Sequence, residues 1–214
     1  MKNGLNIFLG VLSAMLLSWA CLLYGAHRQF GGLTQHKDAA DESLNPAVMP
    51  GLANQGRKVY QDLGCVSCHT QQVRHASTDL ARKWGDRESY PRDYIRDATV
   101  HLGSSRIGPD LRNVGASSPD AAYLYKLLYA PQIFAPGTNK PAYDFLFTVR
   151  PVQGGAASPK ALQLPSKFAP PAGHEVVPSY RAEALVAYLM NLKDSYDYPV
   201  EKSRNEPAKK GAGH

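Results

Sequence analysis

The sequence has few cysteines. Only three occur in 214 residues, Cys21, Cys65 and Cys68. A secreted disulfide scaffold uses a larger and even number of cysteines. Cys21 also lies inside an apolar segment, from which it cannot sensibly pair with the other two. We therefore expect a chain that is not built on a disulfide framework.

Basic helices with interleaved aromatic residues are also missing. The formal net charge is +6, a balance that suits nucleic acid, acidic lipid or an acidic protein as partner. Because no basic helix of that kind occurs, we expect no nucleic-acid partner. Hydrophobic residues make up 43% and charged residues 20%, which favours a packed globular core over global disorder.

Charge is absent from residues 5–24, which read LNIFLGVLSAMLLSWACLLY. A helix of this length spans about 30 Å, the thickness of the hydrocarbon core of a bilayer. Lys2 precedes the segment, while Trp19 and Tyr24 lie toward its far end, where interfacial aromatics are common. The segment predicts a single transmembrane anchor over residues 1–25 with its amino terminus in the cytoplasm.

A cleaved signal peptide is the alternative reading of this segment. The stretch Tyr24-Gly25-Ala26 places a tyrosine where a cleavage site needs a small residue. The residues Ser18-Trp19-Ala20 also do not match the sequence that normally precedes the modified cysteine of a lipoprotein, which here would be Cys21. Residues 26–50 are polar, without sustained periodicity, and we interpret them as a linker.

The run Cys65-Val66-Ser67-Cys68-His69 is a C-x-x-C-H motif, typical of c-type haem attachment. Two thiols three positions apart can each form a thioether to a haem vinyl group, and the following histidine then binds the iron. A thioredoxin-like dithiol would not need the histidine, and a zinc site would need further ligands. The motif predicts one covalent haem c.

Two helices are predicted to frame this motif. A short amphipathic helix over residues 56–64 ends in glycine just before Cys65, and an apolar-faced helix over residues 184–192 is entered at Ser179. This pair resembles the first and last helices of class I cytochromes c. The implied fold is mostly α, with an N-terminal transmembrane helix and a class I cytochrome c domain with long loops over residues 51–194.

Two further segments fit the same fold. Gly108-Pro109-Asp110-Leu111 resembles the loop whose proline carbonyl accepts a hydrogen bond from the proximal imidazole, a contact that orients the ring. Residues 118–120 (Ser-Pro-Asp) predict the N-cap and first turn of a helix that continues to about Tyr129.

Longer motifs sharpen the resemblance. Residues 64–74 (GCVSCHTQQVR), 103–111 (GSSRIGPDL) and 141–146 (PAYDFL) resemble subunit II of cbb(3)-type cytochrome oxidases. The resemblance implies a non-catalytic subunit that receives electrons from another cytochrome c and passes them to a haem–copper catalytic subunit. It also implies an inner-membrane protein whose haem domain lies on the periplasmic side.

The sequence departs from that family in two places. Lys140 occupies the position of the methionine that supplies the distal ligand of the iron. Residues 150–178 form a Pro/Gly/Ala-rich insertion, which we expect to be a surface loop with little secondary structure.

The sequence therefore does not decide which residue is the distal ligand of the haem iron. Lys140 can bind as a neutral amine, but it can equally be an exposed lysine beside a five-coordinate or differently ligated haem. Met190 is predicted to lie off the inward stripe of its helix, which Leu185, Tyr188, Leu189 and Leu192 form. The other methionines are 1, 15 and 49, and the loop histidines to consider are 75, 101 and 174.

A few residues have weaker expectations. Arg106 is predicted either to pair with a haem propionate or to be a solvated surface arginine. Tyr60 and Tyr143 are expected to pack against the haem edge, Trp84 to lie in an exposed loop, and residues 195–214 to form a basic disordered tail.

Three other functions remain open at this point. The chain can be a free-standing membrane cytochrome, or it can serve a nitric oxide reductase related to the oxidases. A haem-based gas sensor becomes credible if the iron is five-coordinate, because an open site binds ligands.

Overall fold

The computed structural model describes residues 2–38, 41–74, 78–194, 196 and 198. It divides into two compact units: Met1–Pro46 with Tyr90–Arg96, and Ala47–Ser89 with Asp97–His214. The first unit contains α1 (Lys2–Phe30) and two short antiparallel strands, β1 (His36–Lys37) and β2 (Leu44–Asn45). It also includes a 3-10 turn, η2 (Pro91–Tyr94), whose Arg92 donates a hydrogen bond to the Thr34 carbonyl.

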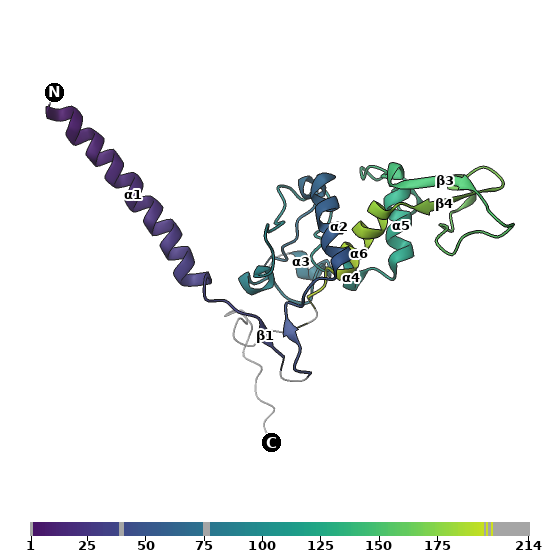
Figure 1. The fold of residues 1–214 in the computed structure, drawn as a ribbon, viewed down its shortest axis with the longest axis horizontal. Coiled ribbons are helices and arrows are strands. Elements are labelled where there is room, and N and C mark those ends of the chain that lie inside the picture. Colours follow the sequence, from purple (N-terminus) through teal and green to yellow (C-terminus); the bar gives the residue numbers. More distant parts are fainter. Residues whose placement is uncertain (1, 39–40, 75–77, 195, 197, 199–214) are drawn as a thin grey trace, which may run out of the picture. The chain divides into compact units, whose positions relative to one another are not determined.

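Helix α1 is long and apolar enough to cross a membrane between Asn3 and Phe30, and Figure 1 shows it as one uninterrupted helix. It extends five residues beyond the end predicted for the anchor. Residues 26–30 contain no proline or glycine, so the helix continues until the Gly31-Gly32 pair, where the Gly31 N–H still bonds the His27 carbonyl at 2.8 Å. The predicted linker is thus helical at its start and contains β1 and β2.

In the second unit, α2 (Gly51–Asp62) packs against α6 (Tyr180–Asn191), and the two lie side by side in Figure 1. They approach most closely at Gly56. A Cβ at this position would collide with the Ala184 carbonyl and lie 2.8 Å from the Tyr188 Cβ. The contact requires glycine, which explains why the helix tolerates a residue of low helix propensity.

Helix α6 matches its sequence pattern. The Ser179 hydroxyl accepts a hydrogen bond from the Ala182 N–H at 3.4 Å, which caps the helix at the predicted residue. The four stripe residues are all buried and Met190 is half-buried, as predicted. The core that they join comprises Val59, Tyr60, Leu124, Leu128, Leu146, Ala182, Leu185, Val186, Tyr188, Leu189 and Leu192.

Shorter helices complete this unit. They are α3 (Thr78–Ala81), α4 (Val114–Ser117) and α5 (Ala121–Tyr129), with 3-10 turns η1 (Cys65–Ser67), η3 (Pro131–Ile133), η4 (Asp144–Leu146) and η5 (Ser166–Phe168). Asp120 is the N-cap of α5, and its carboxylate accepts from the Tyr123 N–H at 2.7 Å. The helix ends at Tyr129, as predicted, but residues 118–120 do not form its first turn, because Ser118 is the C-cap of α4 and α5 begins only at Ala121.

The insertion is more regular than predicted. Strands β3 (Phe147–Pro151) and β4 (His174–Pro178) form an antiparallel pair in which Phe147 lies opposite Pro178 and Val149 opposite Val176. The prediction of a loop with little secondary structure over residues 150–178 is therefore wrong at both ends. Valines at 149, 176 and 177 favour a pleated pair, a signal that the Pro/Gly/Ala content between the strands obscured.

The prediction of a disordered tail from residue 195 is wrong at Tyr196 and Tyr198, which are packed. The Tyr198 side chain is fully buried, and the Arg87 guanidinium lies 5.1 Å from the ring centroids of both Tyr196 and Tyr198. Arg87 Nε also donates to the Tyr196 carbonyl at 3.0 Å. These cation–π contacts hold the two tyrosines against the domain. The rest of the predicted tail lies outside the described residues.

Candidate haem-binding site

The C-x-x-C-H motif forms a single tight turn. The 3-10 turn η1 begins at Cys65, and Cys68 is its C-cap. The N–H groups of Cys68 and His69 both lie near the Cys65 carbonyl oxygen, at 3.2 and 3.0 Å. Both thiols are free and partly buried. The turn therefore presents two thiols and an imidazole within five residues.

The Gly-Pro loop of residues 108–111 orients the His69 ring. Its Nδ1 lies 2.8 Å from the Pro109 carbonyl oxygen. Because a carbonyl can only accept, Nδ1 carries the proton and Nε2 keeps the lone pair that a metal needs. A Cβ on Gly108 would lie 2.7 Å from His69 Nδ1. Glycine at 108 thus lets the backbone pass directly against the imidazole.

Backbone hydrogen bonds join the two loops. The Gly108 N–H donates to the Cys68 carbonyl at 2.9 Å, and the Leu111 N–H donates to the Thr70 carbonyl at 2.8 Å. These bonds lie on either side of the contact between His69 and Pro109. The position of the imidazole is therefore set by a paired stretch of backbone rather than by one hydrogen bond.

Asp110 adds a buried carboxylate to the same junction. It accepts hydrogen bonds from the Thr70 hydroxyl at 2.5 Å, and from the N–H groups of Gln72 and Arg112 at 2.8 Å each. Buried carboxylates persist where several donors satisfy them. Sequence reasoning gave Asp110 no role, although it follows directly after the Gly-Pro pair.

Arg106 is held by a buried carboxylate and a backbone carbonyl near the motif. Its guanidinium pairs with Asp79 at 2.5 Å and donates to the Gln72 carbonyl at 2.7 Å. It lies 5.6 Å from the Trp84 ring centroid, with Arg82 at 5.0 Å from the same ring. Trp84 is therefore partly buried and not in an exposed loop. Arg106 is thus not a solvated arginine, because the buried Asp79 holds one end of its guanidinium, while its Nε atom is buried without a hydrogen-bond partner. The pairing of Arg106 with a haem propionate stays a prediction.

Lys140 is near the motif. Its amine acts electrostatically on Cys65, Cys68 and His69, and it lies 4.9 Å from the Tyr143 ring centroid. Burial lowers the pKa of Lys140 and raises the pKa of Cys65. Burial also raises the pKa of Tyr143 to about 12, with the Cys65 thiol as the next cause. Lys140 and Tyr143, far from the motif in sequence, thus lie close enough to its thiols to influence them electrostatically.

The histidines considered as distal ligands fall in different places. His101 is buried, unlike an ordinary loop histidine: its ring stacks on Tyr60 at 5.6 Å, and its Nδ1 lies 3.3 Å from the Tyr188 hydroxyl. This position is within the packing of α2 against α6. His174 is exposed on β4, and His75 lies outside the described residues.

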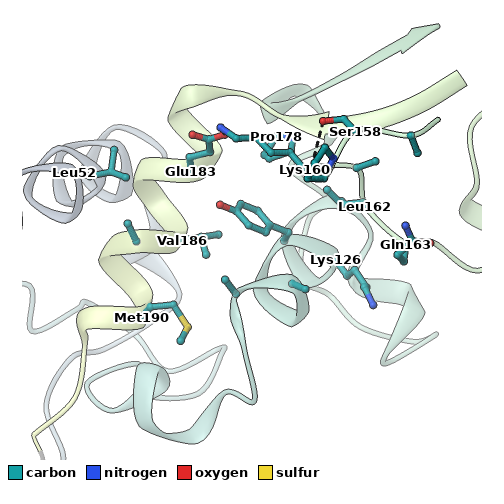
Figure 2. Close-up of a pocket in the computed structure, with 17 residues that line it drawn as sticks. Leu52, Lys126, Ser158, Lys160, Leu162, Gln163, Pro178, Glu183, Val186 and Met190 are labelled. Carbon is teal, nitrogen blue, oxygen red and sulfur yellow. Dashed lines mark hydrogen bonds and ion pairs between the residues drawn. The ribbon is translucent and has the colours of Figure 1, made fainter. Parts of the chain in front are cut away.

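A separate cavity of about 730 Å³ lies between α5, α6 and the loop of residues 157–163. Figure 2 shows Met190 and Val186 of α6 on one side of it, facing Lys126 and Leu162. None of the residues that line this cavity belongs to the C-x-x-C-H turn or to the Gly-Pro loop.

The residues around the motif fit a haem c. The parts that this group needs are present: two unpaired thiols, an imidazole whose Nε2 is left for a metal, and a glycine without a side chain that would collide with the ring. Apolar side chains of Val66, Leu111 and Tyr143 pack beside them on the core.

A family model matches most of the globular part of the chain. The model of the family described as "Cytochrome C oxidase, mono-heme subunit/FixO" matches residues 33–159, more than half of the chain. No curated protein matches the sequence. The matched region contains the C-x-x-C-H turn, the Gly-Pro loop and Lys140. The chain belongs to the family of mono-haem cytochrome c oxidase subunits, and it is an electron-transfer component of an oxidase complex.

Proposed function

We propose that Cys65 and Cys68 bind one haem covalently through thioether bonds and that His69 is the proximal ligand of its iron. The proposal is carried by one observation: His69 Nδ1 is engaged by the Pro109 carbonyl at 2.8 Å while both thiols lie in the same turn. The bound haem would take up and release one electron as its iron changes between the ferric and ferrous states.

The chain's own residues hold and tune this group. The carbonyl of Pro109 keeps the imidazole in one tautomer and increases its basicity. Asp110 and the backbone bonds between the two loops keep that carbonyl in place. A fixed ligand geometry limits the rearrangement that accompanies each change of charge on the iron. Such rigidity suits a relay better than a catalyst.

We further propose that the relay runs from another cytochrome c to the haem–copper catalytic subunit of a cbb(3)-type oxidase. The motifs at residues 64–74, 103–111 and 141–146 support this assignment, as does the family match. Helix α1 would anchor the subunit in the inner membrane, with the haem domain on the periplasmic side where c-type haem is attached.

The test of the haem assignment is a haem stain after denaturing electrophoresis, which detects only covalent haem. The mature full-length protein should stain with one haem per chain, and replacing both Cys65 and Cys68 by serine should abolish the stain. Cys21→Ser, which removes the remaining cysteine, should leave it unchanged. A mature protein without covalent haem would refute the assignment.

The test of the relay is isolation in mild detergent. The protein should copurify with a multi-helix haem–copper subunit, and the complex should reduce oxygen with electrons from a soluble cytochrome c. Reduction of nitric oxide instead would assign the subunit to a related reductase. Isolation of the mature protein without any integral membrane partner would contradict the relay.

A further inference from the structure

A buried polar cluster joins the two crossing helices to the stretch that follows His69. The Tyr188 hydroxyl of α6 donates to the Gln71 side-chain oxygen at 3.0 Å, and His101 Nδ1 lies 3.3 Å from the same hydroxyl. The Tyr60 ring of α2 stacks on the His101 ring, with the two centroids 5.6 Å apart. Each of these four side chains is at most 5% exposed. The cluster therefore belongs to the interior of the domain.

The hydrogen bonds of this cluster determine which nitrogen of His101 carries the proton. Because the Tyr188 hydroxyl gives its one hydrogen to Gln71, its oxygen can only accept from His101. Nδ1 is therefore the protonated nitrogen, and Nε2 keeps a lone pair. Among the described residues, Nε2 has no hydrogen-bond partner, although it is buried. Since buried polar atoms nearly always have a partner, His101 presents an unused basic nitrogen inside the domain.

His101 is the member of the cluster that can change its charge near neutral pH. Burial raises the pKa of Tyr188 to about 12, and it raises the pKa of Tyr60 as well. Both phenols are therefore neutral under ordinary conditions. Gln71 has no charge to gain.

The charged groups around the cluster already have opposite charges as partners. On α2, Arg57 pairs with Asp97 at 3.1 Å. Near Tyr188, Arg112 pairs with Asp194 at 2.6 Å. Neither carboxylate is therefore an unpaired counter-ion for a protonated imidazole at position 101.

The loop that carries His101 lies directly against the C-x-x-C-H turn. A Cβ on Gly103 would collide with the His69 carbonyl oxygen. The Ser104 N–H donates to the Val66 carbonyl at 3.1 Å. Charges interact more strongly in the protein interior than in water. A change of charge at the haem-binding turn should therefore be felt at His101.

We propose that His101 Nε2 takes up a proton when an electron reaches the haem, and releases it when the electron leaves. This inference rests on the proposed covalent haem. The electron comes from the donor cytochrome and reduces ferric iron to ferrous iron, while the proton comes from water and converts the imidazole to imidazolium. Reduction removes one positive charge from the site, which favours a positive charge nearby. Oxidation reverses both transfers.

The coupling should be visible on the acidic side of neutral pH. Burial, and after it the charge of Arg57, lower the pKa of His101 below its ordinary value of about 6.5. Reduction of the haem raises this pKa relative to the oxidised state. The midpoint potential should therefore fall as the pH rises through the two values, and it should be level at higher pH, where His101 is neutral in both states.

The test is a redox titration of the full-length, haem-loaded protein in detergent from acidic to mildly alkaline pH. The midpoint potential of the wild type should fall with rising pH below about pH 6.5. His101→Gln has no proton to gain in this range and should lose that pH dependence. The carboxylates of the haem affect both proteins alike, so the difference between the two curves is the quantity measured.

A second measurement follows the proton directly. In weakly buffered solution at mildly acidic pH, a pH indicator should record proton uptake when the wild type is reduced, and a smaller uptake in His101→Gln. The matched control is His174→Gln, because His174 is exposed on β4. It should give the wild-type potentials and the wild-type proton uptake.

Tyr188→Phe tests the same site without replacing the histidine. It removes the acceptor of the His101 Nδ1–H bond, which stabilises the charged ring more than the neutral ring. The pH-dependent part of the curve should therefore move to lower pH without disappearing. This variant keeps the test decisive if His101→Gln does not fold.

The inference and the proposed function fail in different ways. A wild-type potential that does not depend on pH, equal pH dependence in wild type and His101→Gln, or an unshifted curve in Tyr188→Phe would overturn the coupling, while the haem stain still shows one covalent haem per chain. Absence of that stain in the wild type would instead refute the proposed function.

Discussion

Among individual residues, the buried carboxylates do most to shape the site. Asp79 is 1% exposed, and it accepts from Arg106 at 2.5 Å and from the Arg74 N–H at 2.9 Å. Asp110 closes the neighbouring junction through Thr70 and Gln72. These two aspartates connect the stretch directly after His69 to the Gly-Pro loop. The two aspartates thus hold the Gly-Pro loop in position.

We expect Asp79→Asn to destabilise the domain by about 3 kcal/mol, because it removes the close charged partner of the partly buried Arg106 and leaves it only the more distant Asp110 carboxylate, at 3.8 Å. The matched control is Asp62→Asn. Asp62 pairs with Arg181 at 3.6 Å on the surface, where both side chains are more than half exposed, and such pairs contribute about 0–1 kcal/mol. Denaturant unfolding of the haem-loaded protein measures both. Equal effects of the two variants would contradict a structural role for Asp79.

At the scale of elements, the crossing of α2 and α6 organises the domain. The tight approach at Gly56 brings Ala184 and Tyr188 of α6 against α2. The haem motif follows α2 after only two residues, since α2 ends at Asp62 and η1 begins at Cys65. A shift of α2 relative to α6 would therefore move the thiols as well.

Gly56→Ala tests this crossing. The added Cβ would collide with the Ala184 backbone, and overpacking of this kind costs about 1–3 kcal/mol. Gly51→Ala, in the first turn of the same helix, meets nothing within 4 Å and should be neutral, or stabilising by up to about 1 kcal/mol. Thermal unfolding of both variants is the measurement. If Gly56→Ala were as stable as Gly51→Ala, the described crossing would be wrong.

The β3–β4 pair depends on Glu175, which is buried. Its carboxylate accepts from the Ser158 N–H at 2.6 Å and from Arg150 Nε at 2.8 Å. These hydrogen bonds, that of Ser158 first, lower the pKa of Glu175. A lowered folded-state pKa gives stability that is present above the unfolded pKa, about 4.3, and is lost as the pH falls through the folded value.

Glu175→Gln should therefore loosen the insertion at neutral pH and matter progressively less below about pH 4. Hydrogen exchange at the Ser158 amide, compared in wild type and variant from neutral to acidic pH, measures this locally. A difference between the two proteins that stays constant over the whole range would show that the charge of Glu175 is not what holds the loop.

At the scale of the whole molecule, the sequence predicts features that depend on neighbouring residues, but not the contacts between segments that lie far apart in the chain. The C-x-x-C-H turn, the Ser179 cap and the buried stripe of α6 each depend on residues a few positions apart. Arg106 meets Asp79, 27 positions away, and Arg112 pairs with Asp194 at 2.6 Å across 82 positions. No periodicity encodes which distant segments meet. For the same reason the sequence pattern does not predict the burial of Tyr198.

The last prediction concerns helix α1, because membrane insertion of this helix would determine the location of the whole protein. The described side chains of α1 are exposed, and Asn3–Phe30 has the length and composition of a spanning helix. An apolar helix of this kind is held by the hydrophobic effect rather than by charge. The full-length protein should therefore stay with membranes through high-salt and alkaline washes and be released only by detergent.

A variant in which a cleavable export signal replaces residues 1–30 should be soluble in the periplasm and still carry its haem. Protease added to spheroplasts should digest the native protein beyond residue 30, because the haem domain is proposed to lie outside the cytoplasm.

Mature protein found in the soluble periplasmic fraction, with an amino terminus beyond residue 26, would instead identify α1 as a cleaved signal. The haem domain would then act as a soluble carrier.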